Sequence, residues 1–202
     1  MPAAAFPEPV LASAAVFRAV MDAFARPGEV RQVTGAAAPP SPLSATAAAL
    51  ATAMLDYETP VWLDAALSEH PRVGNWIRLH TGARVTSDPL EAVFAFFAEP
   101  LRAPAFDAFS LGTPEYPDRS TTLVFQVQGF GHVQGFGTGT ALSLSGPGIA
   151  EVRDFSSEPL PPDFPARLTA NRALFPRGVD LILVSPDAVA ALPRSVHVAS
   201  ED

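Results

Sequence analysis

Two residue types are missing from this chain of 202 residues: cysteine and lysine. The absence of cysteine excludes disulfides, thiolate metal sites and a cysteine nucleophile, and it fits a reducing compartment such as the cytoplasm. All 13 basic residues are arginine, so no lysine can form a Schiff base, anchor pyridoxal phosphate or fill the phosphate-binding position of a P-loop. Three classes of enzyme are thereby excluded.

Long apolar runs and a basic leader are also missing. Residues 1–8 contain no basic segment ahead of an apolar one, so we expect no signal peptide. No apolar run approaches the length that spans a bilayer, so we expect a soluble, cytoplasmic protein without membrane contact. The net charge of -8 argues against nucleic acid as a partner. With 48% hydrophobic residues, the length favours a single domain over residues 1–202.

Hydrophobic periodicity predicts helices and strands that alternate along most of the chain. Helices are expected from a Ser13 cap to Arg26, and over 41–56, 71–79 and 163–174, with a short one starting at Ser185-Pro186. Strands are expected at 59–63, 83–86, 92–97, 121–128, 141–144, 179–184 and 195–198.

The expected strands differ in how they should be covered. The run 92–97 is apolar on both faces, which is typical of a strand with layers above and below it. In 121–128, apolar residues alternate with more polar ones, which predicts a half-buried strand. We therefore predict an α/β fold in three layers, a mixed β-sheet with helices on both faces.

The residues that usually carry catalysis do not form recognisable sets. The glycines of 129–139 lack the spacing of a dinucleotide-binding loop and precede a strand, so a hairpin with bulges is the simpler interpretation. Ser145 lacks the G-x-S-x-G context. The histidines, His70, His80, His132 and His197, are scattered. We predict no catalytic, cofactor-binding or metal-binding residue.

Four arginines stand at turns that proline, glycine or serine forces: Arg26, Arg119, Arg177 and Arg194. Arginine makes planar two-point contacts with carboxylate or phosphate, and a rigid turn would hold such a group in place. They are candidates for ligand or interface contacts, and the alternative is that they form structural ion pairs. Exposed aromatic side chains would suit a partner subunit.

A Gly146-Pro147-Gly148 corner follows the apolar strand at 141–144. The two glycines supply backbone angles closed to other residues, and the proline fixes one torsion. We expect this corner to shape a turn at the end of a central strand, and we expect Gly148→Val to harm folding or assembly.

Several segments together resemble one family, the H subunit (PhnH) of the bacterial carbon–phosphorus lyase core complex. They follow one another in the order 17–28, 55–62, 80–83, 112–117, 144–149, 175–180 and 192–194. The resemblance implies a fold similar to the large domain of pyridoxal-phosphate-dependent transferases, without that cofactor. It also implies a homodimer in isolation and assembly with the G, I, J and L subunits.

The activity that the resemblance implies belongs to a complex. Methylphosphonate is joined to the ribose of ATP, adenine leaves, and α-D-ribose 1-methylphosphonate 5-triphosphate is formed during phosphonate use. ATP is a substrate of the complex, and this chain is expected to carry no cofactor. Three roles stay open: a non-catalytic accessory subunit, a subunit that binds a phosphate or phosphonate, and a free-standing transferase whose site is a deep polar pocket with several turn arginines.

Overall fold

The computed structural model describes residues 9–36, 38–131 and 140–198. Its α-helices are α1 (Pro9–Ala25), α2 (Ala45–Met54), α3 (Ala65–Ser68), α4 (Pro71–Thr81) and α5 (Phe164–Ala173). Short 3-10 turns follow at η1 (Pro89–Glu91), η2 (Pro100–Arg102), η3 (Phe106–Ala108) and η4 (Pro117–Arg119). No helix of the described residues is long and apolar enough to cross a membrane.

Within the described residues, the larger sheet has six strands in the order β1-β9-β8-β4-β3-β2. Its strands are β1 (Arg31–Gln32), β2 (Val61–Leu63), β3 (Phe94–Phe97), β4 (Thr122–Gln126), β8 (Asp180–Val184) and β9 (Ala188–Leu192). Strands β2, β3, β4 and β8 are parallel to one another, with β2 at one edge of the sheet, and β9 and β1 add antiparallel pairing at the other edge. Parallel strands of this kind are covered on both faces, as the apolar β3 predicts.

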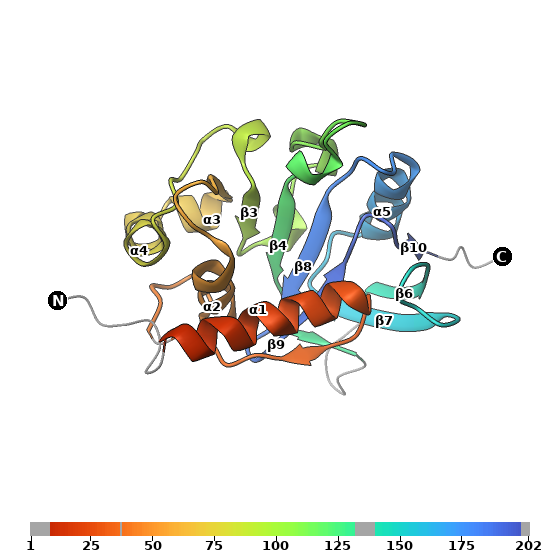
Figure 1. The fold of residues 1–202 in the computed structure, drawn as a ribbon, viewed down its shortest axis with the longest axis horizontal. Coiled ribbons are helices and arrows are strands. Elements are labelled where there is room, and N and C mark those ends of the chain that lie inside the picture. Colours follow the sequence, from red (N-terminus) through yellow and green to blue (C-terminus); the bar gives the residue numbers. More distant parts are fainter. Residues whose placement is uncertain (1–8, 37, 132–139, 199–202) are drawn as a thin grey trace.

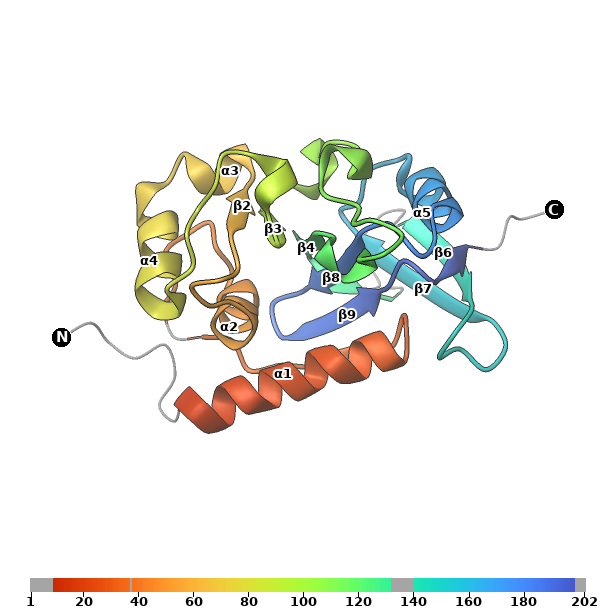
Figure 2. The ribbon, with the colours of Figure 1, turned by 45° about the horizontal axis from the view of Figure 1, so that its top comes forward.

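Helices α1, α2 and α4 cover one face of this sheet (Figure 1), where Phe96, Val124 and Ile182 are buried among them. The opposite face carries the side chains that alternate with these along the strands, among them Phe97 and Phe125. It is covered by α5, the turn η3 and a second sheet. Figure 2 shows that α1 runs alongside β9 and that the second sheet lies beyond the carboxyl end of α1. The mixed α/β sheet between helical layers is therefore confirmed, and one outer layer also contains strands.

The second sheet has four antiparallel strands in the order β10-β6-β7-β5. They are β5 (Gly129–Phe130), β6 (Thr140–Ser145), β7 (Arg153–Glu158) and β10 (His197–Val198). The expected glycine hairpin joins the strands at 121–128 and 141–144, but β4 lies in the larger sheet and β6 pairs with β7 and β10 in this one, so these two strands form no hairpin. Residues 132–139 of that glycine segment lie outside the described residues. Strand β6 belongs to this smaller sheet, so its expected central position is also wrong.

Three further expectations need correction. The strand at 121–128 is not half-buried, because β4 lies between β3 and β8 and buries Leu123, Val124 and Phe125. Ser185-Pro186 starts no helix, because the chain turns there and β9 pairs with β8. The second helix begins at Ala45 rather than at Ser41, because Ser44 Oγ accepts a hydrogen bond from the Ala47 N–H.

Candidate functional site

Arg194, one of the four arginines that the sequence singles out, is nearly buried just beyond the end of β9. Its side chain is 13% exposed and its guanidinium binds both carboxylate oxygens of Asp180, the first residue of β8. Its backbone N–H donates to the same carboxylate at 2.8 Å. Further guanidinium N–H groups donate to the Ser120 hydroxyl and, at 2.6 Å, to the Pro117 carbonyl. Arg194 therefore holds turns together at the amino ends of β4 and β8.

Arg119 and Arg177 belong to the turns that Arg194 holds. Arg119 is exposed and its guanidinium lies 4.3 Å from the centre of the Tyr116 ring. Arg177 follows Pro176, whose carbonyl lies 3.5 Å from Arg194 Nη1. The structure thus brings three of the four candidate arginines to the same end of the larger sheet.

Arg26 is not part of this group. It follows the last residue of α1, and its exposed guanidinium lies 3.7 Å from Asp22 one turn earlier. An exposed pair of this kind contributes little to stability. Arg26 instead marks the place where the end of α1 meets the Gly146-Pro147-Gly148 corner.

The corner forms a turn between β6 and β7, as expected of its glycines. Gly148 has a φ of 83°, and a Cβ atom there would lie 2.3 Å from the Ala25 carbonyl oxygen. Gly28, just past α1, has a φ of 76° and lies against Leu144 of β6. The second sheet therefore packs on the end of α1 through positions where only glycine fits.

A charged cluster that the sequence reasoning missed ties the same two segments together. Arg153 at the start of β7 donates to the Pro27 carbonyl at 3.0 Å and to Glu29 at 2.9 Å. The Glu29 carboxylate also accepts from Arg31. No motif marks Arg153; its only sequence signal is that it closely follows the Gly-Pro-Gly corner. All three side chains are about one-third exposed, at 28 to 30%.

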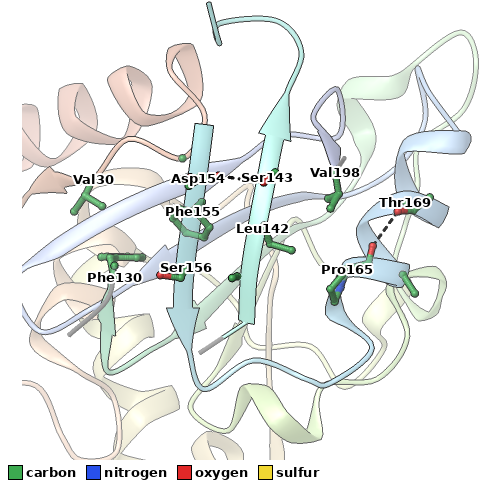
Figure 3. Close-up of a pocket in the computed structure, with 14 residues that line it drawn as sticks. Val30, Phe130, Leu142, Ser143, Asp154, Phe155, Ser156, Pro165, Thr169 and Val198 are labelled. Carbon is green, nitrogen blue, oxygen red and sulfur yellow. Dashed lines mark hydrogen bonds between the residues drawn. The ribbon is translucent and has the colours of Figure 1, made fainter. Parts of the chain in front are cut away.

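An open cavity of about 1020 Å³ lies against the second sheet (Figure 3). Phe130, Ser143, Asp154 and Thr169 are among its lining residues, and Ser143 Oγ donates to Asp154 at 3.1 Å. None of the four candidate arginines lines it. A free-standing transferase was expected to have a deep polar pocket with several turn arginines. This cavity does not meet that description.

The carboxyl ends of the parallel strands, where α/β proteins usually bind ligands, carry one buried acid. Asp64 follows β2 and is 7% exposed, and its two carboxylate oxygens accept from the Leu67 and Glu99 N–H groups, each at 2.9 Å. Burial raises the pKa of Asp64, and the hydrogen bonds from the backbone oppose this. Both oxygens are used in capping α3 and fixing the chain after β3, so this acid is structural.

The other groups that could do chemistry are separated from one another. His80 stacks on Trp76, with 4.3 Å between ring centres, and His197 accepts a hydrogen bond from Arg172. His132 lies outside the described residues. Within the described residues, no three histidine, aspartate or glutamate side chains gather as metal ligands, and no serine hydroxyl is bonded to a histidine. The groups at these turns that are able to bind a ligand or a partner are therefore arginine N–H groups and aromatic rings.

Comparison with known proteins identifies the family of this chain. Residues 4–199 match the family model described as "Bacterial phosphonate metabolism protein (PhnH)". The chain belongs to the PhnH family. It is 46% identical over 197 residues to the α-D-ribose 1-methylphosphonate 5-triphosphate synthase subunit PhnH of Rhizobium meliloti (strain 1021), covering 98% of this chain and 95% of that protein. It is also 39% identical over 88 residues to the putative C-P lyase subunit protein HtxG of Stutzerimonas stutzeri, covering 44% and 42%.

The segments that carry the PhnH resemblance meet in space. Arg194 of the last segment binds Asp180 and the carbonyls of Pro117 and Pro176, which belong to two others. The segment around Gly148 contacts Ala25. Gly82 has a φ of 79°, and a Cβ atom built on it would lie 3.7 Å from Tyr57. Much of the PhnH pattern therefore specifies how distant turns pack.

Proposed function

We propose that this chain is an accessory, non-catalytic subunit of the α-D-ribose 1-methylphosphonate 5-triphosphate synthase assembly in phosphonate catabolism. The observation that carries the proposal is the match to a relative named as a subunit of that synthase, over 98% of this chain at 46% identity. The structure supports it because the family's motif residues are occupied in packing its turns. The transferase activity then belongs to the complex, and the chain alone is inactive.

Reconstitution of the synthase from purified subunits tests this function. Release of adenine from ATP and methylphosphonate is measured by chromatography for the chain alone, for the complete set and for the set without this chain. We expect adenine only from the complete set, with a large loss when this chain is omitted. Adenine release by the chain alone contradicts the proposal, and so does full activity without it.

A second candidate is a subunit whose arginines bind a phosphate or phosphonate. It is supported by Arg119 and Arg177, whose side chains form no ion pair with an acid of the described residues. Calorimetry with ATP, ribose phosphates and methylphosphonate distinguishes the candidates, because only the second predicts heat of binding to the isolated chain.

The finer expectations from the family resemblance extend the same proposal. They are a fold like the large domain of pyridoxal-phosphate-dependent transferases without the cofactor, a cytoplasmic location, the G, I, J and L subunits as partners, and a homodimer in isolation. The absence of lysine supports the first, since pyridoxal phosphate has no residue to bind covalently.

The outer side of α1 supports the homodimer. Val10, Ala14, Phe17 and Met21 follow one another at spacings of four, three and four residues, which is the pattern of a seam between two packed helices. Val10 is 81% exposed, Phe17 46% and Met21 38%, so this seam has no cover within the described chain. A second copy of α1 is the occupant we assign to it.

A further inference from the structure

Two exposed aromatic rings, each with an arginine stacked on it, lie at the turns that Arg194 holds together. Tyr116 is 52% exposed and Phe175 is 51% exposed. The Arg119 guanidinium is 4.3 Å from the Tyr116 ring centre, and the Arg172 guanidinium is 4.8 Å from that of Phe175. With Arg177 between Pro176 and Gly178, these residues form a surface that we call the arginine–aromatic patch.

The patch is one surface because Arg194 joins its two halves. One nitrogen atom, Arg194 Nη1, lies 2.6 Å from the Pro117 carbonyl and 3.5 Å from the Pro176 carbonyl, so these two carbonyl oxygens are neighbours. Pro117 directly follows Tyr116, and Pro176 directly follows Phe175. The Gly178 N–H also donates to the Leu111 carbonyl at 2.9 Å. The two rings are thus displayed on turns that the hydrogen bonds of the nearly buried Arg194 fix in place.

The arginines of the patch keep donors available. Among the described residues, Arg119, Arg172 and Arg177 form no ion pair, although Glu115 and Asp118 stand in the same turn as Arg119. Asp180, the other nearby acid, is occupied by Arg194. A guanidinium stacked on a ring still presents its N–H edge outward. Although the whole chain has a net charge of -8, the arginines of this patch, unpaired among the described residues, attract carboxylates.

We propose that the arginine–aromatic patch docks an acidic surface of another subunit of the assembly. This inference rests on the proposed function, and it specifies which surface makes the heteromeric contact. Tyrosine and arginine are the residues most enriched among those that dominate binding at interfaces, and a rigid display lowers the cost of ordering them. The partner contributes aspartate or glutamate side chains that accept two-point hydrogen bonds from the arginines.

Neither a second copy of this chain nor a small anion fits the patch as well. A twofold interface uses the same surface of both copies, and with the patch at its axis Arg119, Arg172 and Arg177 would face arginines as well as acids. A small-ligand site is concave and encloses its ligand, whereas both rings are about half exposed and the cavity of Figure 3 includes none of these residues.

The test is co-purification of tagged chain with the other subunits of the synthase, followed by measurement of the dissociation constant. The variant Arg119→Glu/Arg177→Glu reverses two charges of the patch. The control Arg72→Glu reverses an exposed arginine on α4 that forms no ion pair in the described part of the chain. We expect the double variant to bind at least about tenfold more weakly than wild type and the control to bind as wild type does. Tyr116→Ala should also weaken binding.

The outcomes separate this proposal from the proposed function. Equal binding by wild type, double variant and control overturns the patch as the docking surface and leaves the accessory role intact. Failure of wild type itself to co-purify overturns both. Unchanged assembly together with loss of ATP or methylphosphonate binding in the double variant also overturns it, in favour of an anion site. Thermal melts that match wild type exclude unfolding as the cause of lost binding.

Discussion

At the scale of single residues, Arg194 and Arg26 show how differently two arginines at turns behave. The Arg194 side chain is 13% exposed and pairs with both oxygens of Asp180, which is 21% exposed. Arg26 and Asp22 are 52% and 60% exposed and 3.7 Å apart. Solvent screens the Arg26–Asp22 pair, whereas the Arg194–Asp180 pair is largely shielded from water.

Replacing each arginine by methionine should therefore have unequal effects on stability. We expect Arg194→Met to lower the free energy of unfolding by about 2 to 4 kcal/mol, because the Asp180 carboxylate loses its partner while remaining largely buried. Arg26→Met should change it by less than about 0.5 kcal/mol. Urea unfolding followed by tryptophan fluorescence measures both. Equal losses in the two variants would show that Arg194 does not anchor its turns.

Gly148 and Gly82 form a second matched pair of residues. Both have a left-handed backbone, with φ of 83° and 79°. A Cβ atom on Gly82 would come no closer than 3.7 Å to a neighbour, but one on Gly148 would lie 2.3 Å from the Ala25 carbonyl oxygen. Alanine at Gly82 should cost about 1 to 2 kcal/mol for its backbone conformation alone.

Gly148→Ala adds a backbone collision to the same conformational cost. We expect it to lose about 3 kcal/mol or more, because either the corner or the end of α1 must move. Denaturant midpoints of the two alanine variants give the comparison. If Gly148→Ala were no less stable than Gly82→Ala, the close packing of the corner on α1 would be refuted.

At the scale of elements, the short helix α3 depends on the buried cap Asp64. Burial raises the folded-state pKa of this carboxyl above its ordinary 3.8. The folded protein then holds a proton that the unfolded chain releases, so the stability from Asp64 is greatest below the ordinary pKa. It falls as the pH rises through the raised pKa.

Asp64→Asn should remove this dependence on pH. We expect the variant to lose about 1 kcal/mol or more at about pH 4, since its amide cannot accept both backbone hydrogen bonds. The deficit relative to wild type should shrink towards about pH 7, where wild type carries the cost of a buried charge. Urea midpoints across this range measure it, with the exposed cap residue Asp88 of η1, changed to asparagine, as the baseline. A deficit that grows with pH would contradict the assignment.

Elements with strong local signals could be predicted from the sequence, and those set by distant contacts could not. The strand β3, which is apolar on both faces, and the helix before Pro27 were predicted from their patterns, but the helix begins at Pro9 and Ser13 lies inside it rather than capping it. The turn at Ser185-Pro186 has the same residue types as a helix start, and only pairing of β9 with β8 decides against the helix. Strand β7 was missed because Phe155 is the only apolar residue between Arg153 and Glu158, so the segment lacks the alternation of a strand and is ordered by pairing with β6.

For the candidate site, the arginines at turns could be predicted from the sequence, but their contacts could not. Sequence reasoning identified Arg119, Arg177 and Arg194 as arginines at rigid turns, and the structure places them together. That Arg194 is used internally follows only from its pairing with Asp180, which lies 14 residues away and shows no sign in the sequence of being its partner. The stacking of Arg172 on Phe175 also depends on how the end of α5 turns.

At the scale of the whole molecule, two surfaces lie on different elements and suit different occupants. The arginine–aromatic patch is made by turns at the amino ends of β4 and β8, whereas the α1 seam is apolar and helical. The buried side of α1, with Val16 and Val20, packs on the larger sheet, so changes to the seam leave the core intact.

Antiparallel packing of two α1 helices that cross at residue 19 would match the second half of the seam, Phe17 and Met21, to itself. A crossing point at residue 19 places each Phe17 opposite the partner's Met21, since both are two residues from the axis. The half of the seam that contains Phe17 and Met21 would thus face its own copy across the twofold axis.

Charging the seam should therefore convert a dimer into a monomer without unfolding it. We expect wild type to sediment as a dimer at micromolar concentration and Phe17→Glu/Met21→Glu as a monomer, because two acidic side chains would face two others in the paired helices. Ala15→Glu, exposed on α1 outside the seam, should stay dimeric. Sedimentation velocity gives the masses, and matched thermal melts verify folding. A double variant that remains a dimer would place the homodimer contact elsewhere, and a monomeric wild type would refute the homodimer itself.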